Sequence, residues 1–171
     1  NSIFNGNTKV TAGNIYVQGA TFNDSVTFTK TGGINNNNNG KQNIFNSVCT
    51  INQQSNTGYF MLSLGSSDQF NGDIVINGPG IGAVNIGAAI AGSSPVLAAG
   101  KIIKTGSSGF SGGSLSLGAL TQLGTIPITL NFPGTSSIVL GYGSTFNAKL
   151  YLTAASISVV GNTFNDTVSF T

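Results

Sequence analysis

The 171-residue sequence contains no glutamate, arginine, histidine or tryptophan, and only 6% of its residues are charged. An average protein carries about 25% charged residues. General acid–base and nucleophilic catalysis rely on histidine, glutamate or a base paired with a nucleophile. The lack of these groups predicts that the protein is not an enzyme. Because glutamate and arginine are missing and methionine occurs once, helices are not expected either.

The low content of charged residues and cysteine argues against a nucleic-acid-binding protein, a metalloprotein and a protein with a reactive thiol. Six lysines and four aspartates leave a net charge of +2, and they are scattered along the chain. Nucleic-acid-binding domains concentrate basic residues on one face, so we expect no nucleic-acid partner. Metal sites need clustered ligands, so no metal or other cofactor is expected. The one cysteine, Cys49, occupies an inward position of a predicted strand and is expected to be a buried, unreactive thiol.

Long hydrophobic runs are missing as well. No apolar stretch approaches the roughly 20 residues that a membrane-spanning helix needs, and no signal peptide precedes Asn1. The sequence starts and stops within its repeating pattern, so we expect mature protein or a segment of a longer chain. Hydrophobic residues still make up 39% of the sequence, which argues against disorder.

What the sequence does contain is a phenylalanine–asparagine motif that occurs six times. The phenylalanines are Phe4, Phe22, Phe45, Phe70, Phe146 and Phe164, and the asparagines are Asn5, Asn23, Asn46, Asn71, Asn147 and Asn165. Four and six residues after the phenylalanine the sequence is apolar with one exception, and the residue between these positions is mostly polar. A period of two indicates a β-strand with one buried face. We expect the phenylalanines to form an inward stack and each asparagine to lie at a corner.

A longer repeat contains the short one. Residues 1–29 align without gaps to residues 143–171, with 15 of 29 positions identical. Motif spacings near 20 residues are typical of solenoids. The sequence therefore predicts one all-β domain over residues 1–171, a β-solenoid or parallel β-helix of about 7–8 coils with short strands and Gly/Asn-rich turns. A right-handed coil is favoured. For the 142-residue unit we expect about seven coils and an advance of ~34 Å.

Three segments between the motifs carry separate expectations. Residues 35–39 are five consecutive asparagines, interpreted as a surface loop or corner, with a side-chain amide ladder between coils as the alternative. Residues 81–100 are rich in glycine and alanine and are predicted to form a thin part of the coil with a strand over 83–86. Residues 14–17 are predicted to be a strand with Ile15 and Val17 facing inward.

The Thr-Phe-Asn motif, as in residues 21–26 and 163–168, resembles the repeat units of giant secreted surface proteins of Bacteroidota-type bacteria. Looser matches at 68–76, 109–123 and 144–150 extend the resemblance over essentially the whole chain. The resemblance implies a β-solenoid in a large extracellular or cell-surface protein, either an adhesin or a fibre. It supplies no catalytic residues.

Two functional hypotheses follow. The first is a structural fibre, filament or stalk of the cell surface or extracellular matrix. Its partners would be further copies of itself, joined end to end in one chain or between subunits and also bundled laterally. The second is an adhesin or carbohydrate-binding module that uses Tyr16, Tyr142 and Tyr151. Ice binding would need a regular threonine array, and the position five after each phenylalanine is too irregular for that.

Overall fold

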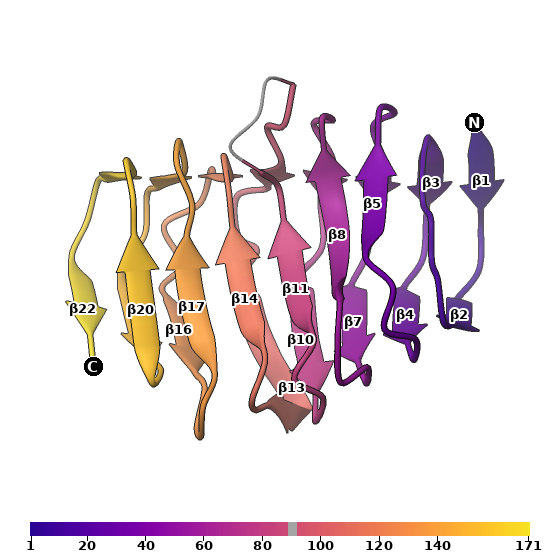
Figure 1. Cartoon of the computed structure of the whole chain (residues 1–171). Helices are drawn as coiled ribbons and strands as arrows, with labels where there is room; N and C mark the ends of the chain where they lie inside the picture. The colour runs from indigo at the N-terminus through magenta and orange to yellow at the C-terminus, as the bar shows by residue number, and fades with distance from the viewer. Residues whose placement is uncertain (89–91) are drawn as a thin grey trace.

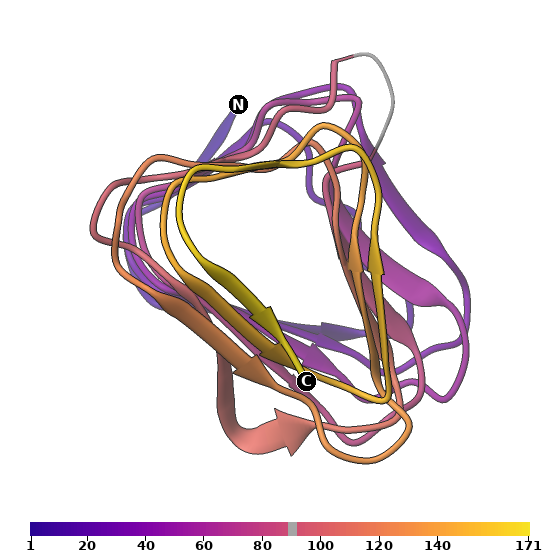
Figure 2. The ribbon, with the colours of Figure 1, turned by 90° about the vertical axis from the view of Figure 1, so that its left-hand side faces the viewer.

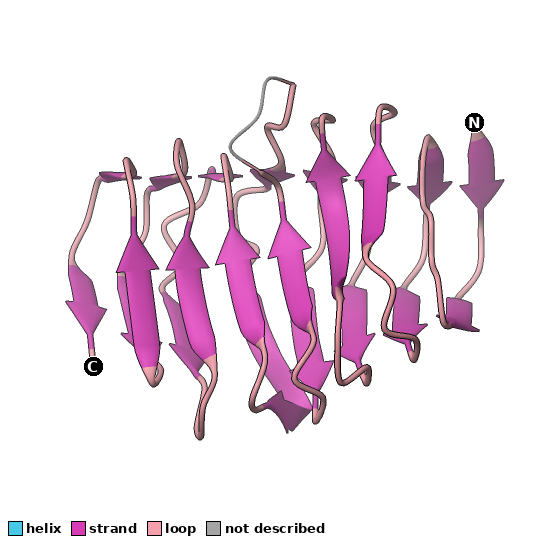
Figure 3. Cartoon of the chain, in the orientation of Figure 1, coloured by secondary structure: helices cyan, strands magenta, loops and turns pink. Residues whose placement is uncertain are grey.

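A computed structural model describes residues 1–88 and 92–171 of the chain. These residues contain no helix, and so none that could cross a membrane. Their short strands wind into one β-solenoid, in which every described strand pair is parallel (Figures 1 and 3). The predicted all-β solenoid is the fold of this protein.

Each coil is a triangle of three walls when viewed along the axis (Figure 2). The first wall is an eight-stranded sheet, so the solenoid has eight coils, within the predicted number. Its strands are β1 (Ser2–Phe4), β3 (Ala20–Phe22), β6 (Ile44–Phe45), β9 (Gln69–Phe70), β12 (Val96–Leu97), β15 (Thr121–Gln122), β18 (Thr145–Phe146) and β21 (Thr163–Phe164). Most of these strands are two residues long, and a corner follows each of them directly.

The second wall carries the alternating strand that follows each motif. It consists of a five-stranded sheet and a three-stranded sheet. Their strands are β2 (Thr8–Ala12), β4 (Val26–Lys30), β7 (Cys49–Gln53), β10 (Ile74–Gly78), β13 (Ile103–Phe110), β16 (Ile128–Asn131), β19 (Leu150–Thr153) and β22 (Val168–Phe170). The register between β10 and β13 shifts after Ile76, and β13 stands away from the triangle there (Figure 2).

The third wall closes the triangle with a six-stranded sheet. Its strands are β5 (Asn36–Asn39), β8 (Tyr59–Leu64), β11 (Ala83–Ile86), β14 (Ser114–Leu117), β17 (Ser137–Leu140) and β20 (Ser156–Val159). The predicted strand over 83–86 is present as β11. The rest of the prediction for 81–100 includes residues 89–91, which lie outside the described residues.

The coil is right-handed. In Figure 1 the chain advances from right to left while the strands of the third wall, in front, point upward. In Figure 2, where the C-terminal end faces the viewer, the path runs up the third wall, across the first and down the second. A counter-clockwise path that advances toward the viewer is right-handed, which is the usual hand of crossovers between parallel strands.

Alternation within each strand fills the interior. In β4, Val26 and Phe28 are buried while Thr27 and Thr29 are partly exposed. Full burial of such an apolar side chain contributes roughly 1.5–3 kcal/mol. The corners bring backbones close together: a Cβ on Gly32 would lie 2.7 Å from the Cα of Gly13, so only glycine fits at this crossing.

Two expectations for the third wall are wrong. Residues 36–39 are not a loop or a corner but strand β5, and Asn36 is buried because it pairs in register with the inward Phe60. Asn36 forms no amide ladder, since neither of its amide atoms has a partner among the described residues. The ladder predicted for residues 37–39 concerns side chains that lie outside the described part of the chain. Residues 14–17 form no strand, although Ile15 and Val17 are buried as expected.

The expected count of seven coils in the 142-residue unit is also wrong. Strand register leads from Phe4 to Phe146 in six steps, through Phe22, Phe45, Phe70, Leu97 and Gln122. Neighbouring coils are 18 residues apart at the two ends and 23 to 27 apart between them. The inner coils are longer mainly because the segments that connect their strands are longer, and in the fifth coil because β13 is longer. At about 4.8 Å a coil, the unit advances roughly 29 Å instead of 34 Å.

Candidate functional site

The six motif phenylalanines lie in one column on the first wall and form two stacks of nearly parallel rings. The first stack is Phe4, Phe22, Phe45 and Phe70, and the second is Phe146 and Phe164. Neighbouring ring centroids are 4.9, 5.4 and 4.9 Å apart in the first stack and 5.8 Å apart in the second. The inner rings are buried, whereas Phe4 in the first coil is 38% exposed and Phe164 in the last is partly buried.

Two residues without the motif fill the gap between the stacks. Leu97 pairs with Phe70, and Gln122 pairs with both Leu97 and Phe146. Both side chains are fully buried. The Gln122 Nε2 donates to the Ile126 carbonyl at 3.3 Å, but its Oε1 has no partner among the described residues. The aromatic column is therefore interrupted for two coils by one apolar and one polar side chain.

The motif asparagines form amide ladders beside the stacks. Nδ2 donates to the Oδ1 of the preceding coil at 2.7 Å from Asn23 to Asn5, and at 2.9 Å from Asn46 to Asn23 and from Asn71 to Asn46. Asn165 donates to Asn147 at 2.6 Å. One coil before Asn147, the corner residue is Leu123 and not asparagine. The Asn147 Nδ2 donates instead to the Gln122 carbonyl at 2.7 Å. Each ladder ties neighbouring corners together.

Sequence reasoning missed a second polar corner, between the third and first walls. Asn43 Oδ1 accepts from the Ala20 amide at 3.1 Å, and its Nδ2 donates to the Val17 carbonyl at 3.1 Å. Asn162 makes the same pair of bonds, to the Ser144 amide and the Leu140 carbonyl. The available signal was an asparagine two residues before the motif phenylalanine, which occurs at both positions.

Asp68 continues this corner into the next coil and is fully buried. Its Oδ1 accepts hydrogen bonds from the Asn43 backbone amide at 2.7 Å and from the Ser66 hydroxyl at 3.1 Å, and its Oδ2 accepts from the Asn43 side chain at 3.2 Å. Burial raises the pKa of the Asp68 carboxyl, and these hydrogen bonds only partly offset the effect. The group links two coils and has no basic partner in an ion pair among the described residues.

Two further polar groups face inward on the second wall. Cys49 is fully buried, and burial raises the pKa of its thiol, with the Asp68 charge adding to the effect. A thiol that stays protonated is a poor nucleophile. Lys30 is buried too; its ammonium donates to the Gly13 carbonyl at 2.9 Å, and burial lowers its pKa. Both groups are enclosed by the coil.

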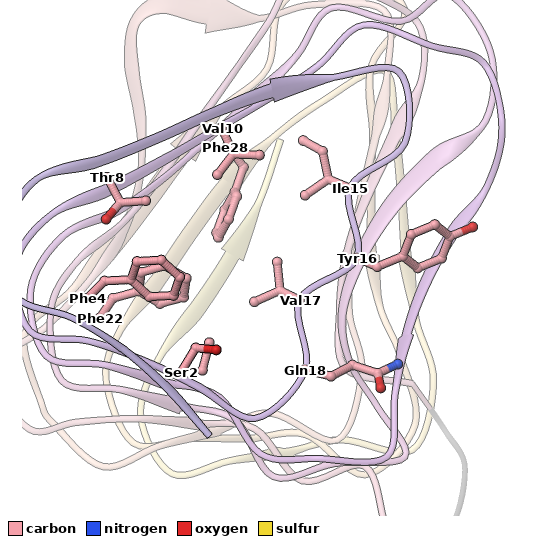
Figure 4. A pocket seen from close by; sticks show the side chains of 11 residues that line it. Ser2, Phe4, Thr8, Val10, Ile15, Tyr16, Val17, Gln18, Phe22 and Phe28 are labelled. Atoms are coloured by element: carbon pink, nitrogen blue, oxygen red, sulfur yellow. The ribbon is translucent and has the colours of Figure 1, made fainter.

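The two end coils expose apolar side chains, because no further coil packs against them. At the first coil, a hollow of about 200 Å³ lies inside the triangle, and Phe4, Val17 and Phe28 project into it (Figure 4). Ile3 is 64% exposed on the outer side of β1. At the last coil, Phe170 is 47% exposed. The backbone edges of β1 and β21 are the outermost edges of the first wall.

The tyrosines proposed for adhesion do not form one surface. Tyr16 points outward from the first coil (Figure 4), whereas Tyr142 lies at the end of the sixth coil, between β17 and β18, and Tyr151 lies in β19 of the seventh coil. A separate hollow of about 180 Å³ lies on the second wall next to β13. Its polar lining includes Asn52, Asn77 and Ser108, and Asn77 Oδ1 has no partner among the described residues.

Within residues 1–88 and 92–171, no group of three or more histidine, cysteine, aspartate or glutamate residues could hold a metal ion. Comparison of the chain with family models, with curated proteins and with solved structures finds no match. The features that distinguish this molecule are the asparagine amide ladders, the phenylalanine stacks beside them, and the exposed first and last coils at which both end.

Proposed function

We propose that this protein is a structural repeat protein whose β-solenoid forms a filament, fibre or stalk of the cell surface or extracellular matrix. The observation that carries the proposal is that the aromatic stack, the amide ladder and the parallel backbone pairing all reach the outermost coil at each end. Further coils extend the same contacts, as later copies in one chain or as neighbouring subunits.

The outermost strands of the first wall favour addition of another strand. Natural sheet edges are commonly protected by charged residues, proline or bulges, because unpaired backbone groups recruit other strands. Neither β1 (Ser-Ile-Phe) nor β21 (Thr-Phe) carries a charge or a proline. Residues 1–29 and 143–171 give the two ends related sequences. A contact between unlike ends is open-ended, so it produces filaments instead of closed rings.

The sequence resemblance supports an extracellular location, and the composition supports lateral contacts between filaments. The likeness of the Thr-Phe-Asn motif to giant secreted surface proteins supports an extracellular or cell-surface site, including a biofilm matrix. With 6% charged residues, neighbouring rods repel one another weakly. Lateral bundling of filaments is therefore part of the proposal.

Electron microscopy and sedimentation of the purified chain over a range of concentrations test the proposal. We expect rods that lengthen with concentration, a fibre-diffraction reflection at about 4.8 Å, and an axial repeat of roughly 38 Å if each subunit contributes eight coils. Monodisperse single particles at every concentration would overturn subunit assembly. A tandem chain of two copies that behaves as two independently tumbling domains would overturn the covalent form as well.

A second candidate, carbohydrate binding by an adhesin, is supported by the hollow beside β13. Amide and hydroxyl groups are the groups that hydrogen-bond sugar hydroxyls, and side chains of this kind from Asn52, Asn77 and Ser108 line the hollow. Binding of the chain to a glycan array, reduced by Asn77→Ala and unchanged by Asn56→Ala at an exposed corner, would support this function. No binding to any glycan would remove it.

A further inference from the structure

The amide ladders have a direction. In every described bond between motif asparagines, the Nδ2 donor belongs to the later coil and the Oδ1 acceptor to the earlier coil. A shorter ladder on the second wall runs the same way, with Asn77 donating to Asn52 and Asn52 to Thr29. An amide has both a donor and an acceptor, so either direction is chemically available. One direction is used throughout.

The backbone at the motif corner has the same polarity. The amide N–H of the motif asparagine donates to the carbonyl of the phenylalanine one coil earlier, at 2.9 Å from Asn23 to Phe4 and at 2.8 Å from Asn71 to Phe45. Asn165 does the same to Phe146 at 2.9 Å. Side chain and backbone therefore form two hydrogen-bond columns whose donors all face the N-terminal end of the solenoid.

This polarity leaves opposite groups at the two ends. The Asn5 side chain accepts from Asn23, and its own Nδ2 and backbone N–H have no acceptor among the described residues. At the other end, Asn165 donates to Asn147, and the Asn165 Oδ1 and the Phe164 carbonyl have no donor within the same residues. At the motif corner, the first coil therefore presents two free donors and the last coil two free acceptors.

We propose that the partner at each end is a second copy bound head to tail, in which Asn5 of one copy donates to Asn165 of the next. This inference rests on the filament function proposed above and specifies its polarity. By the register of the inner coils, Phe4 lies opposite Phe164 of the neighbouring copy and Ile3 opposite Thr163. The first two walls form the contact, with β1 adding to β21 and β2 to β22.

The reverse arrangements lack these contacts. A head-to-head pair brings the Asn5 donors of two copies together, and a tail-to-tail pair brings two Asn165 acceptors together. Reversing one copy also makes the joining strands antiparallel, which none of the described strand pairs is. Polar groups left without partners in a contact are costly, so the ladder selects one orientation.

The substitution Asn5→Asp tests the unpaired Asn5 Nδ2 donor, because it removes this donor and keeps the acceptor for Asn23. A carboxylate oxygen still accepts from Asn23, so the bond within the chain remains. The outward group becomes an acceptor that faces the Asn165 acceptor of the neighbour. We expect unchanged circular dichroism and thermal unfolding, but association at least tenfold weaker by sedimentation. Asn56→Asp, at an exposed corner of the third coil, introduces the same charge as a matched control and should associate like the wild type. Equal association of all three proteins would overturn the inference.

Cross-linking reads the orientation directly. Ile3→Cys and Thr163→Cys place thiols on exposed positions of β1 and β21, and the native Cys49 is fully buried and does not compete. A short bis-maleimide should join an Ile3→Cys chain to a Thr163→Cys chain, and should not join either chain to itself. Filaments together with Ile3–Ile3 or Thr163–Thr163 linkage would overturn the polarity and leave the filament function standing. The lack of both filaments and cross-links would overturn the filament function, and the polarity with it.

Discussion

Coils one to four and coils five and six solve the same packing problem with different side chains. The first four place phenylalanine at the column position of the first wall, and the next two place Leu97 and Gln122 there. The corner after the column is asparagine in the first four coils and Ala98 or Leu123 in the next two. We call coils one to four the regular coils and coils five and six the substituted coils.

Backbone pairing is nearly the same in both sets. The Ala98 amide donates to the Phe70 carbonyl at 2.9 Å, and the Leu123 amide to the Leu97 carbonyl at 2.9 Å. The corresponding bond in the regular coils, from Asn71 to Phe45, is 2.8 Å long. The coil thus requires parallel pairing and an inward side chain of sufficient volume. The aromatic stack and the amide ladder are additions that fix register and stabilise the regular coils.

The largest effect should come from truncating the stack. Phe45→Ala removes a fully buried ring that contacts Phe22 and Phe70 on both sides. Loss of transfer energy and the resulting cavity predict destabilisation by about 3–5 kcal/mol. Urea unfolding followed by circular dichroism would measure it, with Thr27→Ala on the outer face as the control. Equal stability of Phe45→Ala and the control would mean that the stack contributes little.

The local sequence pattern is sufficient to predict part of this fold, but not the positions that only pairing between coils determines. The period of two and the repeated motif identify inward positions such as Val26 and Phe28 directly. Leu97 and Gln122 could not be assigned to the column, because neither carries the motif and their positions follow only from pairing with neighbouring coils. The loop or corner predicted for Asn36 is wrong for a related reason: register with Phe60 turns its side chain inward although it is polar.

The ends of the coil were only partly predictable. Sequence identity between residues 1–29 and 143–171 indicates that the ends are related. It does not reveal the direction of the amide bonds, because asparagine donates and accepts equally well. That direction depends on the side-chain geometry at Asn5 and Asn165, which sequence does not contain.

A second effect should follow pH, through the buried Asp68 of the regular coils. At the same position, the substituted coils have Pro95 and Leu120, which do not titrate. The folded-state pKa of Asp68 lies above the unfolded value of about 3.9. The folded protein therefore holds this proton to higher pH, and stability falls as pH rises through the window between the two values.

Asp68→Asn should remove this slope. Urea midpoints measured from pH 3 to 8 would show it as a difference between wild type and variant that changes with pH. Asp73 also titrates. Partial burial acts to raise its pKa, but its bonds to Lys104 and the Ile102 amide bring the pKa below its usual value, and this contribution is common to both proteins. Parallel pH profiles for the two proteins would contradict the prediction.

Gln122→Leu tests the substituted coils and should stabilise them. The change removes a buried Oε1 that has no partner among the described residues, at the loss of one 3.3 Å bond from Nε2 to Ile126. Leaving a buried polar group unsatisfied costs about 1–3 kcal/mol, so we expect a gain toward the lower part of that range. Gln69→Leu changes an exposed position of the same sheet and is the matched control. A lower urea midpoint for Gln122→Leu than for the control would show that the Gln122 amide is satisfied.

The smallest expected effect comes from extending the amide ladder into the substituted coils. The Asn71 Oδ1 has no donor above it among the described residues, because the next corner residue is Ala98. The Ala98 backbone makes the same bond to Phe70 that the Asn71 backbone makes to Phe45, so an asparagine at 98 has the geometry to donate to Asn71. One net hydrogen bond contributes about 0.5–1.5 kcal/mol. Ala98→Asn should therefore slow amide hydrogen exchange at this corner by about two- to tenfold, whereas Ala99→Asn, at the exposed neighbouring position, should not. Equal exchange in the two variants would mean that the ladder in the regular coils follows from the backbone and does not reinforce it.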